Sequence, residues 1–367
     1  MMSLPDLNWV TGKTHVPVYV LSADKDNINA RIQDRLISLS LTDNRGFEAD
    51  QLDIELDDSD GRLSLPRRGT ELSLHLGWQG EALVHKGRFI VDEIEYSGAP
   101  DKITVRARSA DFRATLNISR ELSYHQKTIS DIVLTIAQRN NLKPAVDDTL
   151  SNIMLNHIDQ TNESDGSFLT RLAKQEGAIA TVKNGCLLFM PQGQNQTVSG
   201  RPLPTVSITR KAGDNYRFSL ADRSAYTGVS ASWLNTREPK KKENVTVKRK
   251  RRKTTPKKKE EKQGEYLAGS EGNVLVLKHT YAYKSNAERA AKAEWEKIQR
   301  GVASFSMQLA TGRPELFPEM KVRVKGFKPE IDQADWTLVT VTHTLNDSGL
   351  TSALDLEVKI SDADMGA

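Results

Sequence analysis

Few residues of this 367-residue chain have types and spacings that could support chemistry. Gly12-Lys13-Thr14 matches the end of a phosphate-binding P-loop, but Leu7 stands where that loop needs its first glycine. The run Asp58-Ser59-Asp60-Gly61 is typical of a calcium loop, but its register puts Leu56 and Arg67 where carboxylates must bind the ion. We therefore expect no nucleotide site at the first motif and a simple turn at the second.

Carboxylates, histidines and thiols offer no better site. Glu163 and Asp165 flank an expected helix start, where the helix dipole stabilises negative charge, so we interpret them as capping residues rather than an acid–base pair. The seven histidines are scattered singly, with His75 and His85 the only pair within ten residues. Cys186 is the single cysteine, and its apolar neighbours favour a buried structural thiol. These patterns predict no enzyme, no metal site and no cofactor.

The elements around these residues are mostly strands. Between Val16 and Leu116, apolar residues alternate with polar ones, as in Leu52, Ile54 and Leu56 among three acids. This is the pattern of half-buried antiparallel strands. Turn signals such as Ser97-Gly98-Ala99-Pro100 separate the strands, which predicts a small β-barrel or sandwich.

This strand pattern returns about 250 residues later, which indicates an internal duplication. The stretch 87–94 is matched by Trp336 to Val341, and His343 takes the place of Tyr96, so we expect its ring to pack within a strand. We equate the third strand of each copy by its apolar residues, which are Ile103, Val105 and Ala107 in the first and Leu356, Val358 and Ile360 in the second.

Helical periodicity appears in two places. Between 117 and 200, Thr128 can cap one helix, and a second helix begins at Ser164 and ends at Gly177, which suits a left-handed cap. With the strands around them they predict a small α/β domain. The third region, which resumes strands at Val206, holds a helix over 285–300 whose apolar face includes Trp295, and we expect that face to dock on the second β-region.

Composition and charge narrow the class of protein. Hydrophobic residues make up 37% and charged residues 27%, and no apolar run approaches the roughly 20 residues that span a bilayer. The first fourteen residues lack the apolar core of a signal peptide, so we expect folding in the cytoplasm. Residues 240–262 carry a net charge of +10, which leaves −6 on the rest of the chain, whose overall charge is +4.

The basic segment has almost no apolar residue, so we expect a mobile loop inserted in the second β-region. It is either a solvated charge run or a contact for a polyanion, meaning nucleic acid, anionic lipid or an acidic assembly partner. The candidate contact residues are Lys248, Arg249, Lys250, Arg251, Arg252, Lys253, Lys257, Lys258 and Lys259. The alternative function is therefore a nucleic-acid-binding or regulatory protein that acts through this loop by non-specific DNA contact.

Two stretches resemble a known family. The run from Gln160 to Ala173 resembles the Q-x-x-E-S-D-x-x-F-L-x-R-L segment of contractile-phage tail hubs and of the valine-glycine-repeat spike proteins of type VI secretion. The stretch Leu41 to Ile54, with Arg108 to Arg113, is similar to the late control protein D family of temperate myophages. The similarity extends over nearly the whole chain.

The resemblance implies a mainly β chain with two tube-like β-barrels and an inserted α/β domain, assembling as a pseudo-sixfold trimeric ring. It implies a structural baseplate hub of a phage tail or tailocin, which would adapt the sixfold tail tube to the threefold spike. The implied partners are further copies of the chain, the central spike protein, the tail tube protein or tube initiator, and the tape-measure protein. We expect the helix with Trp295 and the outer strands to supply lateral contacts, in a virion assembled in the host cytoplasm.

The expected division of the chain combines these points. It has an N-terminal arm (1–15), a first barrel (16–116), an α/β domain (117–200), a second barrel (201–236 and 264–361) with the docked helix 285–300, a basic mobile loop (237–263) and a C-terminal tail (362–367).

Overall fold

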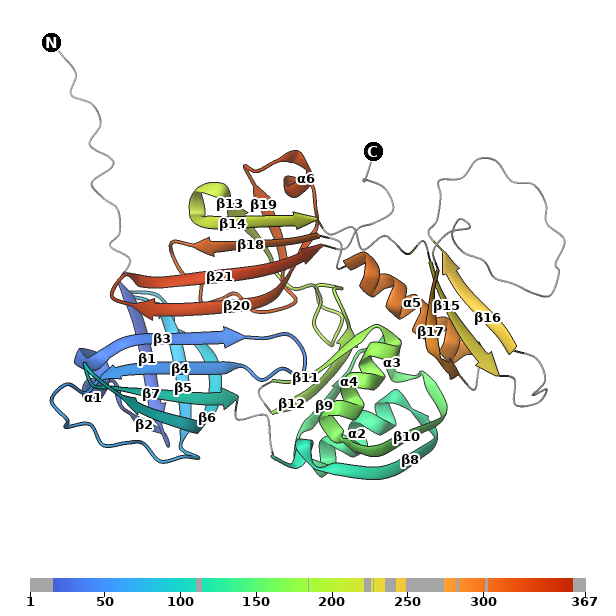
Figure 1. Cartoon of the computed structure of the whole chain (residues 1–367), viewed down its shortest axis with the longest axis horizontal. Helices are drawn as coiled ribbons and strands as arrows, with labels where there is room; N and C mark the ends of the chain where they lie inside the picture. Colours follow the sequence, from blue (N-terminus) through green and yellow to red (C-terminus); the bar gives the residue numbers. More distant parts are fainter. Residues whose placement is uncertain are drawn as a thin grey trace, which may run out of the picture.

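The computed structural model is elongated, with a strand-rich part at one end and two smaller α/β parts at the other (Figure 1). It describes residues 16–109, 114–183, 185–220, 226, 228–234, 242–248, 274–281, 284–300 and 303–358. The expected N-terminal arm and C-terminal tail lie outside these residues. None of the described helices is long and apolar enough to cross a membrane.

The first β unit, residues 17–109, is an antiparallel sheet with the strand order β3-β4-β7-β6-β5-β1-β2. The leucines predicted to face inward are buried, and Leu39, Leu52 and Leu74 are completely covered. Polar residues alternate with them along each strand, which is how one face of a sheet forms a core while the other meets solvent. Its elements are β1 (Pro17–Ala23), β2 (Asp26–Asn27), α1 (Asn29–Ile32), η1 (Gln33–Arg35), β3 (Leu36–Asp43), β4 (Gln51–Asp57), β5 (Glu71–Trp78), β6 (Val84–Ser97) and β7 (Lys102–Ser109).

The second β unit comprises residues 205–220 and 303–358, and its core is built on Trp336 and Phe305. Its β20 pairs with β3 of the first unit, so both units belong to one 13-stranded sheet (Figure 1). The hydrogen-bonded strand order is an open path in the described residues, so closed barrels stay a prediction. The elements are β13 (Thr205–Thr209), η3 (Arg210–Ala212), β14 (Gly213–Leu220), β18 (Ala303–Leu309), β19 (Lys321–Lys325), α6 (Pro329–Asp332), β20 (Trp336–Asn346) and β21 (Gly349–Val358).

Each β unit contains the same three-stranded meander, β5-β6-β7 in the first and β19-β20-β21 in the second. Both meanders carry a bulge at the same step, between Val91 and Glu93 and between Leu338 and Thr340. A bulge adds one unpaired residue to a strand and changes which residues face the core. Its recurrence therefore aligns the two units residue by residue, with Phe89 equivalent to Trp336.

This alignment corrects the expected match of the third strands. Tyr96 pairs with Ile103, whereas the equivalent His343 pairs with Ser352, so Ile103 corresponds to Ser352 and not to Leu356. The expected register was four residues off. An even shift leaves every apolar residue on the same face, so alternation alone cannot detect it. The second hairpin also continues to a tight turn after Asn346, which the first does not.

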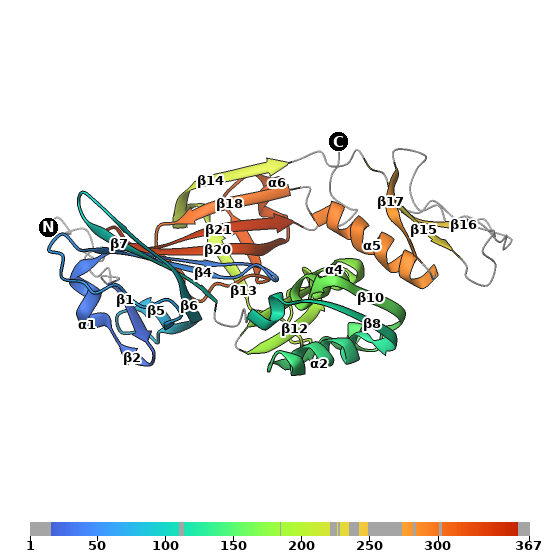
Figure 2. The same cartoon turned by 60° about the horizontal axis from the view of Figure 1, so that its bottom comes forward.

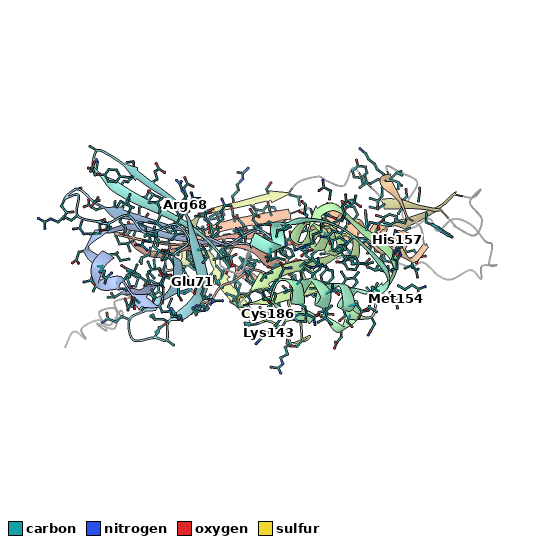
Figure 3. All side chains as sticks on the ribbon, turned by 90° about the horizontal axis from the view of Figure 1, so that it is seen from below. Arg68, Glu71, Lys143, Met154, His157 and Cys186 are labelled. Carbon is teal, nitrogen blue, oxygen red and sulfur yellow. The ribbon has the colours of Figure 1, made fainter. Side chains whose placement is uncertain are left out.

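The inserted α/β domain contains a two-stranded ribbon and a three-stranded sheet around two helices (Figure 2). The predicted caps are confirmed: Thr128 forms a capping box with Asp131, Ser164 caps the second helix, and Gly177 ends it in the left-handed conformation with φ of 66°. Cys186 is partly exposed rather than buried, because it begins β12 opposite Lys143 near the domain surface (Figure 3). The elements are η2 (Ala114–Asn117), β8 (Ser119–Thr128), α2 (Ile129–Arg139), β9 (Lys143–Val146), α3 (Asp148–Ser151), β10 (Met154–Ser164), α4 (Asp165–Glu176), β11 (Ala178–Lys183) and β12 (Cys186–Pro191).

The long helix packs on strands that we expected in the second barrel, but these strands form a separate sheet. Helix α5 (Lys284–Arg300) covers β15 (Gly228–Leu234), β16 (Lys242–Lys248) and β17 (Val274–Tyr281), and both β15 and β17 fall within the expected barrel ranges 201–236 and 264–361. Its predicted apolar face is correct, but it covers Val229 and Ala231 of β15 with Ala287 and Trp295. This face is therefore occupied within the chain, and a lateral contact through the other faces of α5 stays a prediction.

The predicted loop is also partly a strand. Residues 242–248 form β16, which pairs with β15 along its whole length. The physical reason lies in Val245-Thr246-Val247, whose β-branched residues favour a strand despite the charges on either side. The expected loop over 237–263 is thus interrupted by a strand of the α5 sheet.

Candidate functional site

The basic residues chosen from the sequence are not placed by the structure. Lys248 ends β16, with its side chain undescribed, while Arg249 to Lys253 and Lys257 to Lys259 lie outside the described residues. The polyanion contact therefore stays a prediction. Gly12-Lys13-Thr14 also lies outside the described residues.

The acidic run at Asp58 is a charged turn, as predicted. Asp60 forms an ion pair with Arg35, with 2.6 Å between Nη2 of Arg35 and Oδ2 of Asp60. The hydrogen bond from Arg35 lowers the pKa of Asp60 to about 2. The Asp58 carboxylate accepts a hydrogen bond from the Leu63 amide. Both carboxylates are therefore used in closing the turn. No group of three or more His, Cys, Asp and Glu side chains among the described residues is arranged to hold a metal ion.

Glu163 and Asp165 have separate structural roles rather than the shared capping role that we expected. Ser164 is the cap, while Glu163 pairs with Arg171 at 2.8 Å. Asp165 is completely buried and accepts hydrogen bonds from Arg139 and from the side chain of Gln160. It thus ties α4 to α2 and β10. The family-like segment Gln160 to Ala173 is therefore a folding element of the inserted domain.

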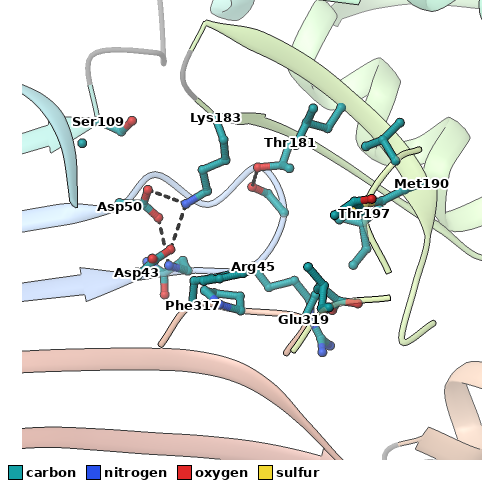
Figure 4. A pocket seen from close by; sticks show the side chains of 18 of the residues that line it. Asp43, Arg45, Asp50, Ser109, Thr181, Lys183, Met190, Thr197, Phe317 and Glu319 are labelled. Carbon is teal, nitrogen blue, oxygen red and sulfur yellow. Dashed lines mark hydrogen bonds and ion pairs between the residues drawn. The ribbon is translucent and has the colours of Figure 1, made fainter. Parts of the chain in front are cut away.

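The strongest polar constellation lies where the first β unit meets the inserted domain (Figure 4). Lys183, at the end of β11, reaches across to two carboxylates of the first unit, with Nζ 2.9 Å from Asp43 and 2.5 Å from Asp50. Both carboxylates are buried, and Asp50 also accepts the Asn44 amide, which fixes the β3–β4 loop. Thr181, two residues before Lys183, donates to the Gly46 carbonyl in the same loop.

A second cluster joins that loop to the second β unit. Arg45 lies between two carboxylates, with Nε 2.6 Å from Glu319 and Nη1 2.5 Å from Glu357. Glu319 is buried, has a φ of 73°, and accepts the Gly193 amide from the segment that leaves the inserted domain. Non-glycine residues adopt such backbone angles at a cost, so this geometry is held by its surroundings. The loop therefore contacts all three parts through one short stretch.

Lys86 of β6 completes the joint between the two β units. Its Nζ donates to the carbonyls of Pro314 and Leu316 at 3.1 Å each and lies 3.8 Å from Asp43. Close to it, His343 is completely buried and its Nδ1 lies 2.8 Å from the hydroxyl of Ser352. The ring of His343 therefore packs within a strand, as predicted.

We name this joint the three-way junction and define it by Asp43, Arg45, Asp50, Lys86, Lys183, Glu319 and Glu357. Burial and neighbouring charges shift the pKa values of several groups in and beside it. Burial raises the pKa of Asp50 to about 6, although Lys183 acts in the opposite direction. Burial lowers the pKa of Lys86, and it lowers that of His343 to about 3 with a further contribution from the Lys86 charge. For Lys183, the attraction of Asp43 and Asp50 outweighs burial and raises its pKa.

A cavity of about 860 Å³ opens beside the three-way junction. Its walls come from all three parts, with Phe89 of the first unit, Ile179 and Met190 of the inserted domain, and Phe317 near the second unit. The charges of the three-way junction are held by opposite charges or carbonyls, so they suit fixing the parts together. The arrangement is mechanical in character: it sets the angle between the β units and the inserted domain.

Comparison with known proteins gives this architecture a context. The model of the phage tail baseplate hub family matches residues 37–349. The chain belongs to this family. Its function is accordingly that of a baseplate hub in the tail of a phage particle.

The relatives of this hub agree with that assignment. A probable baseplate hub protein of Escherichia phage 186 is 53% identical over 97% of this chain and 96% of its own length. The 43 kDa tail protein of prophage MuSo2 from Shewanella oneidensis has the same fold, with a TM-score of 0.65 at 14% identity over 95% of this chain and 99% of that one. The Escherichia coli protein c3393, a component of type VI secretion, reaches a TM-score of 0.52 at 11% identity over 89% and 74%. The resemblance to phage hubs is confirmed, and the type VI protein shares the fold.

Proposed function

We propose that this hub adapts the symmetry of the tail, with three chains forming a ring that has six similar β units. One side of the ring would receive the sixfold tail tube or its initiator, and the other the threefold central spike. The units would be residues 17–109 and residues 205–220 with 303–358. The basic segment, residues 240–262, would offer a contact for the tape-measure protein or another acidic partner.

The observation that carries this proposal is the duplicated meander with its bulge at the same step. A matching register means that two surfaces of one chain can present the same backbone geometry to identical neighbours. Three copies then offer six equivalent positions, which is the simplest way for a closed trimer to meet a sixfold ring. The pairing of β3 with β20 supports the same idea, because it places the two units side by side in one sheet.

The three-way junction would give the ring its stiffness. Buried ion pairs hold a geometry because breaking one partner leaves the other charge uncompensated. Lys183 and Arg45 act on the loop between β3 and β4, which follows the strand that joins the two units. A rigid angle here would keep the inserted domains at fixed positions around the ring.

Stoichiometry tests the proposal directly. The full-length protein would be purified with the spike protein and the tube initiator, and the mass of each complex measured by light scattering and native mass spectrometry. We expect three hub chains with three spike chains, and six initiator subunits on the tube side. The exposed-surface variant Lys297→Ala, on α5, serves as a control and should leave these ratios unchanged. A hub that remains monomeric with both partners, or binds only three initiator subunits, would overturn the adapter role.

A further inference from the structure

The ribbon of the inserted domain carries a pair of histidines that the hub role does not use. His125 of β8 and His157 of β10 are direct cross-strand partners, and both are exposed. Their rings stack with centroids 4.6 Å apart, and the two Nδ1 atoms lie 3.0 Å from each other. His157 lies near the end of the molecule away from the first β unit (Figure 3).

A carboxylate fixes the proton on one of these rings. Asp159 Oδ2 lies 2.9 Å from His157 Nε2, and Ser123 donates to Oδ1 of the same carboxylate at 2.6 Å. A carboxylate oxygen accepts hydrogen bonds, and Oδ1 already accepts the hydroxyl hydrogen of Ser123. His157 Nε2 must therefore carry hydrogen, and the neutral ring presents the lone pair of Nδ1 toward His125. Such a carboxylate–histidine pair is the usual support behind a metal-binding imidazole.

The spacing of the two nitrogens suits one shared ion. Metal–imidazole bonds are about 2.0–2.1 Å long, so two nitrogens 3.0 Å apart would subtend an angle of roughly 95° at an ion between them. Angles near a right angle suit the tetragonal geometry of Cu²⁺ or Ni²⁺ better than the tetrahedral geometry of zinc. In the metal-free protein the Nδ1–H of His125 donates to that lone pair. Both rings are exposed, so this hydrogen can pass through solvent to Nε2 of His125, and small side-chain rotations can then direct both Nδ1 lone pairs to one point. We propose that His125 and His157 form a binding site for a divalent ion of the Cu²⁺ or Ni²⁺ type, completed by water.

The consequence for the protein is a clamp on the ribbon. The opposite face of β8 and β10 covers the core of the inserted domain through Tyr124 and Ile158. The ribbon is only two strands wide, and such ribbons are weakly stable without further support. An ion that bridges the two strands would hold them together and favour the folded state by mass action.

A second histidine pair supplies a matched control. His75 and His85 also face each other across two strands, with ring centroids 4.7 Å apart. Their rings are tilted by 50°, His75 Nδ1 is buried, and His85 Nε2 lies 3.4 Å from Ser73 Oγ. This pair lacks the carboxylate support that Asp159 gives His157.

Calorimetric titration of the untagged full-length protein with Cu²⁺ and with Ni²⁺ tests the site. We expect one strong equivalent, and for Cu²⁺ an electron paramagnetic resonance spectrum with two nitrogen ligands. His125→Gln and His157→Gln should each weaken binding at least tenfold and remove one nitrogen from the spectrum, while His85→Gln should change neither. Asp159→Asn, a change of a positioning residue, should weaken binding about 10-fold to 100-fold without changing the ligand count.

Opposite results would overturn the site. Equal affinity in wild type and in the double variant His125→Gln with His157→Gln would show that the ion binds elsewhere. An equal loss in His85→Gln would show the same. Unchanged affinity in Asp159→Asn would show that Asp159 does not support ion binding by fixing the tautomer of His157.

Discussion

The two β units have the same backbone plan and different side chains. Phe89 and Trp336 occupy equivalent places, as do Tyr96 and His343, yet Tyr96 is 54% exposed while His343 is completely buried. Tyr96 donates to Asp101 at the edge of its hairpin, whereas His343 lies in a strand that pairs with β3 on one side and β21 on the other. The repeat therefore fixes register, while each unit's neighbours decide burial.

The difference shows that equivalent positions of a duplicated unit can serve as surface in one copy and as core in the other. A surface position in one copy can become a core position in the other without any change of backbone pairing. In the second unit the buried His343 lies close to Lys86, whose amine donates to the carbonyls of Pro314 and Leu316. The first unit keeps the corresponding position open to solvent, where a partner can reach it.

The largest expected effect comes from the equivalent core positions. Trp336→Ala should lower the free energy of unfolding by about 3–5 kcal/mol, and Phe89→Ala by a similar or smaller amount, because each leaves a cavity in a fully covered core. Trp336 should cost more, since its Nε1 also donates to the Ile331 carbonyl. Scanning calorimetry measures the loss, with Trp336→Phe as the control that keeps a ring. An unchanged transition in both alanine variants would show that these equivalent side chains do not stabilise the cores of the two units.

The next prediction compares the stability that each β unit gains from its contacts with the inserted domain. Lys183→Met should destabilise the protein by about 3–5 kcal/mol, because it leaves the buried Asp50 without its cation and Asp43 with only the longer contact to Lys86. Glu319→Gln, on the second unit, should cost less, since an amide oxygen can still accept the Gly193 amide. Denaturant unfolding monitors both. The triple change Lys183→Met, Asp43→Asn and Asp50→Asn should recover much of the loss, and no recovery would contradict the electrostatic cause.

The sequence predicts local structure better than it predicts which elements pack against each other. The caps at Thr128 and Ser164 and the alternating leucines follow from neighbouring residues, so they could be found without a structure. The docking of α5 could not, because an apolar helix face fits any apolar sheet. The strand β16 was missed because its charged surroundings hid a short β-branched run.

The three-way junction was also beyond the sequence for a physical reason. Lys183 and its carboxylates are more than 130 residues apart, and a lysine at the end of an apolar strand has the same pattern as a solvent-facing one. The only sequence signal was that Asp43, Arg45 and Asp50 fall within the stretch Leu41 to Ile54 that resembles the family. That signal marked the loop and did not identify its partner.

Acidification should act on the second unit and the junction in opposite directions. The pKa of Asp50 is raised to about 6 from 3.8, so protonation of the folded state adds stability as pH falls from about 6 toward 4. The pKa of His343 is lowered to about 3 from 6.5, so the unfolded state binds the proton first and stability is lost below about pH 6.5. The two effects partly cancel in the wild type.

Two variants separate these contributions. Between pH 7 and 4.5, the free energy of unfolding of Asp50→Asn should fall by about 1–3 kcal/mol more than that of the wild type. Over the same range the free energy of unfolding of His343→Gln should fall by less than that of the wild type. Thermal unfolding at pH 7, 6, 5 and 4.5 reads both slopes. Tyr96→Phe is the control in the first unit, since the Asp101 hydrogen bond raises the pKa of Tyr96 above 10 and outside this range. Parallel slopes in all three variants would reject this account of the junction.

The smallest effect concerns the outer faces of the two meanders. Arg106 pairs with Glu93 at 2.6 Å on the first unit, and the equivalent positions of the second unit hold Asp355 and Thr340, which have no such charge pair. Exposed ion pairs contribute little because water and salt screen them, so Arg106→Ser should lower the free energy of unfolding by less than about 1 kcal/mol. At 1 M salt, where the pair is screened, the variant and the wild type should be equally stable. If the adapter role is correct, the same variant should still assemble with three hub chains while binding the tube initiator less tightly, because it alters one of two alternating faces of the ring. A loss of stability as large as that of Trp336→Ala would instead mean that this face is part of the core, and that the two units differ in fold as well as in surface.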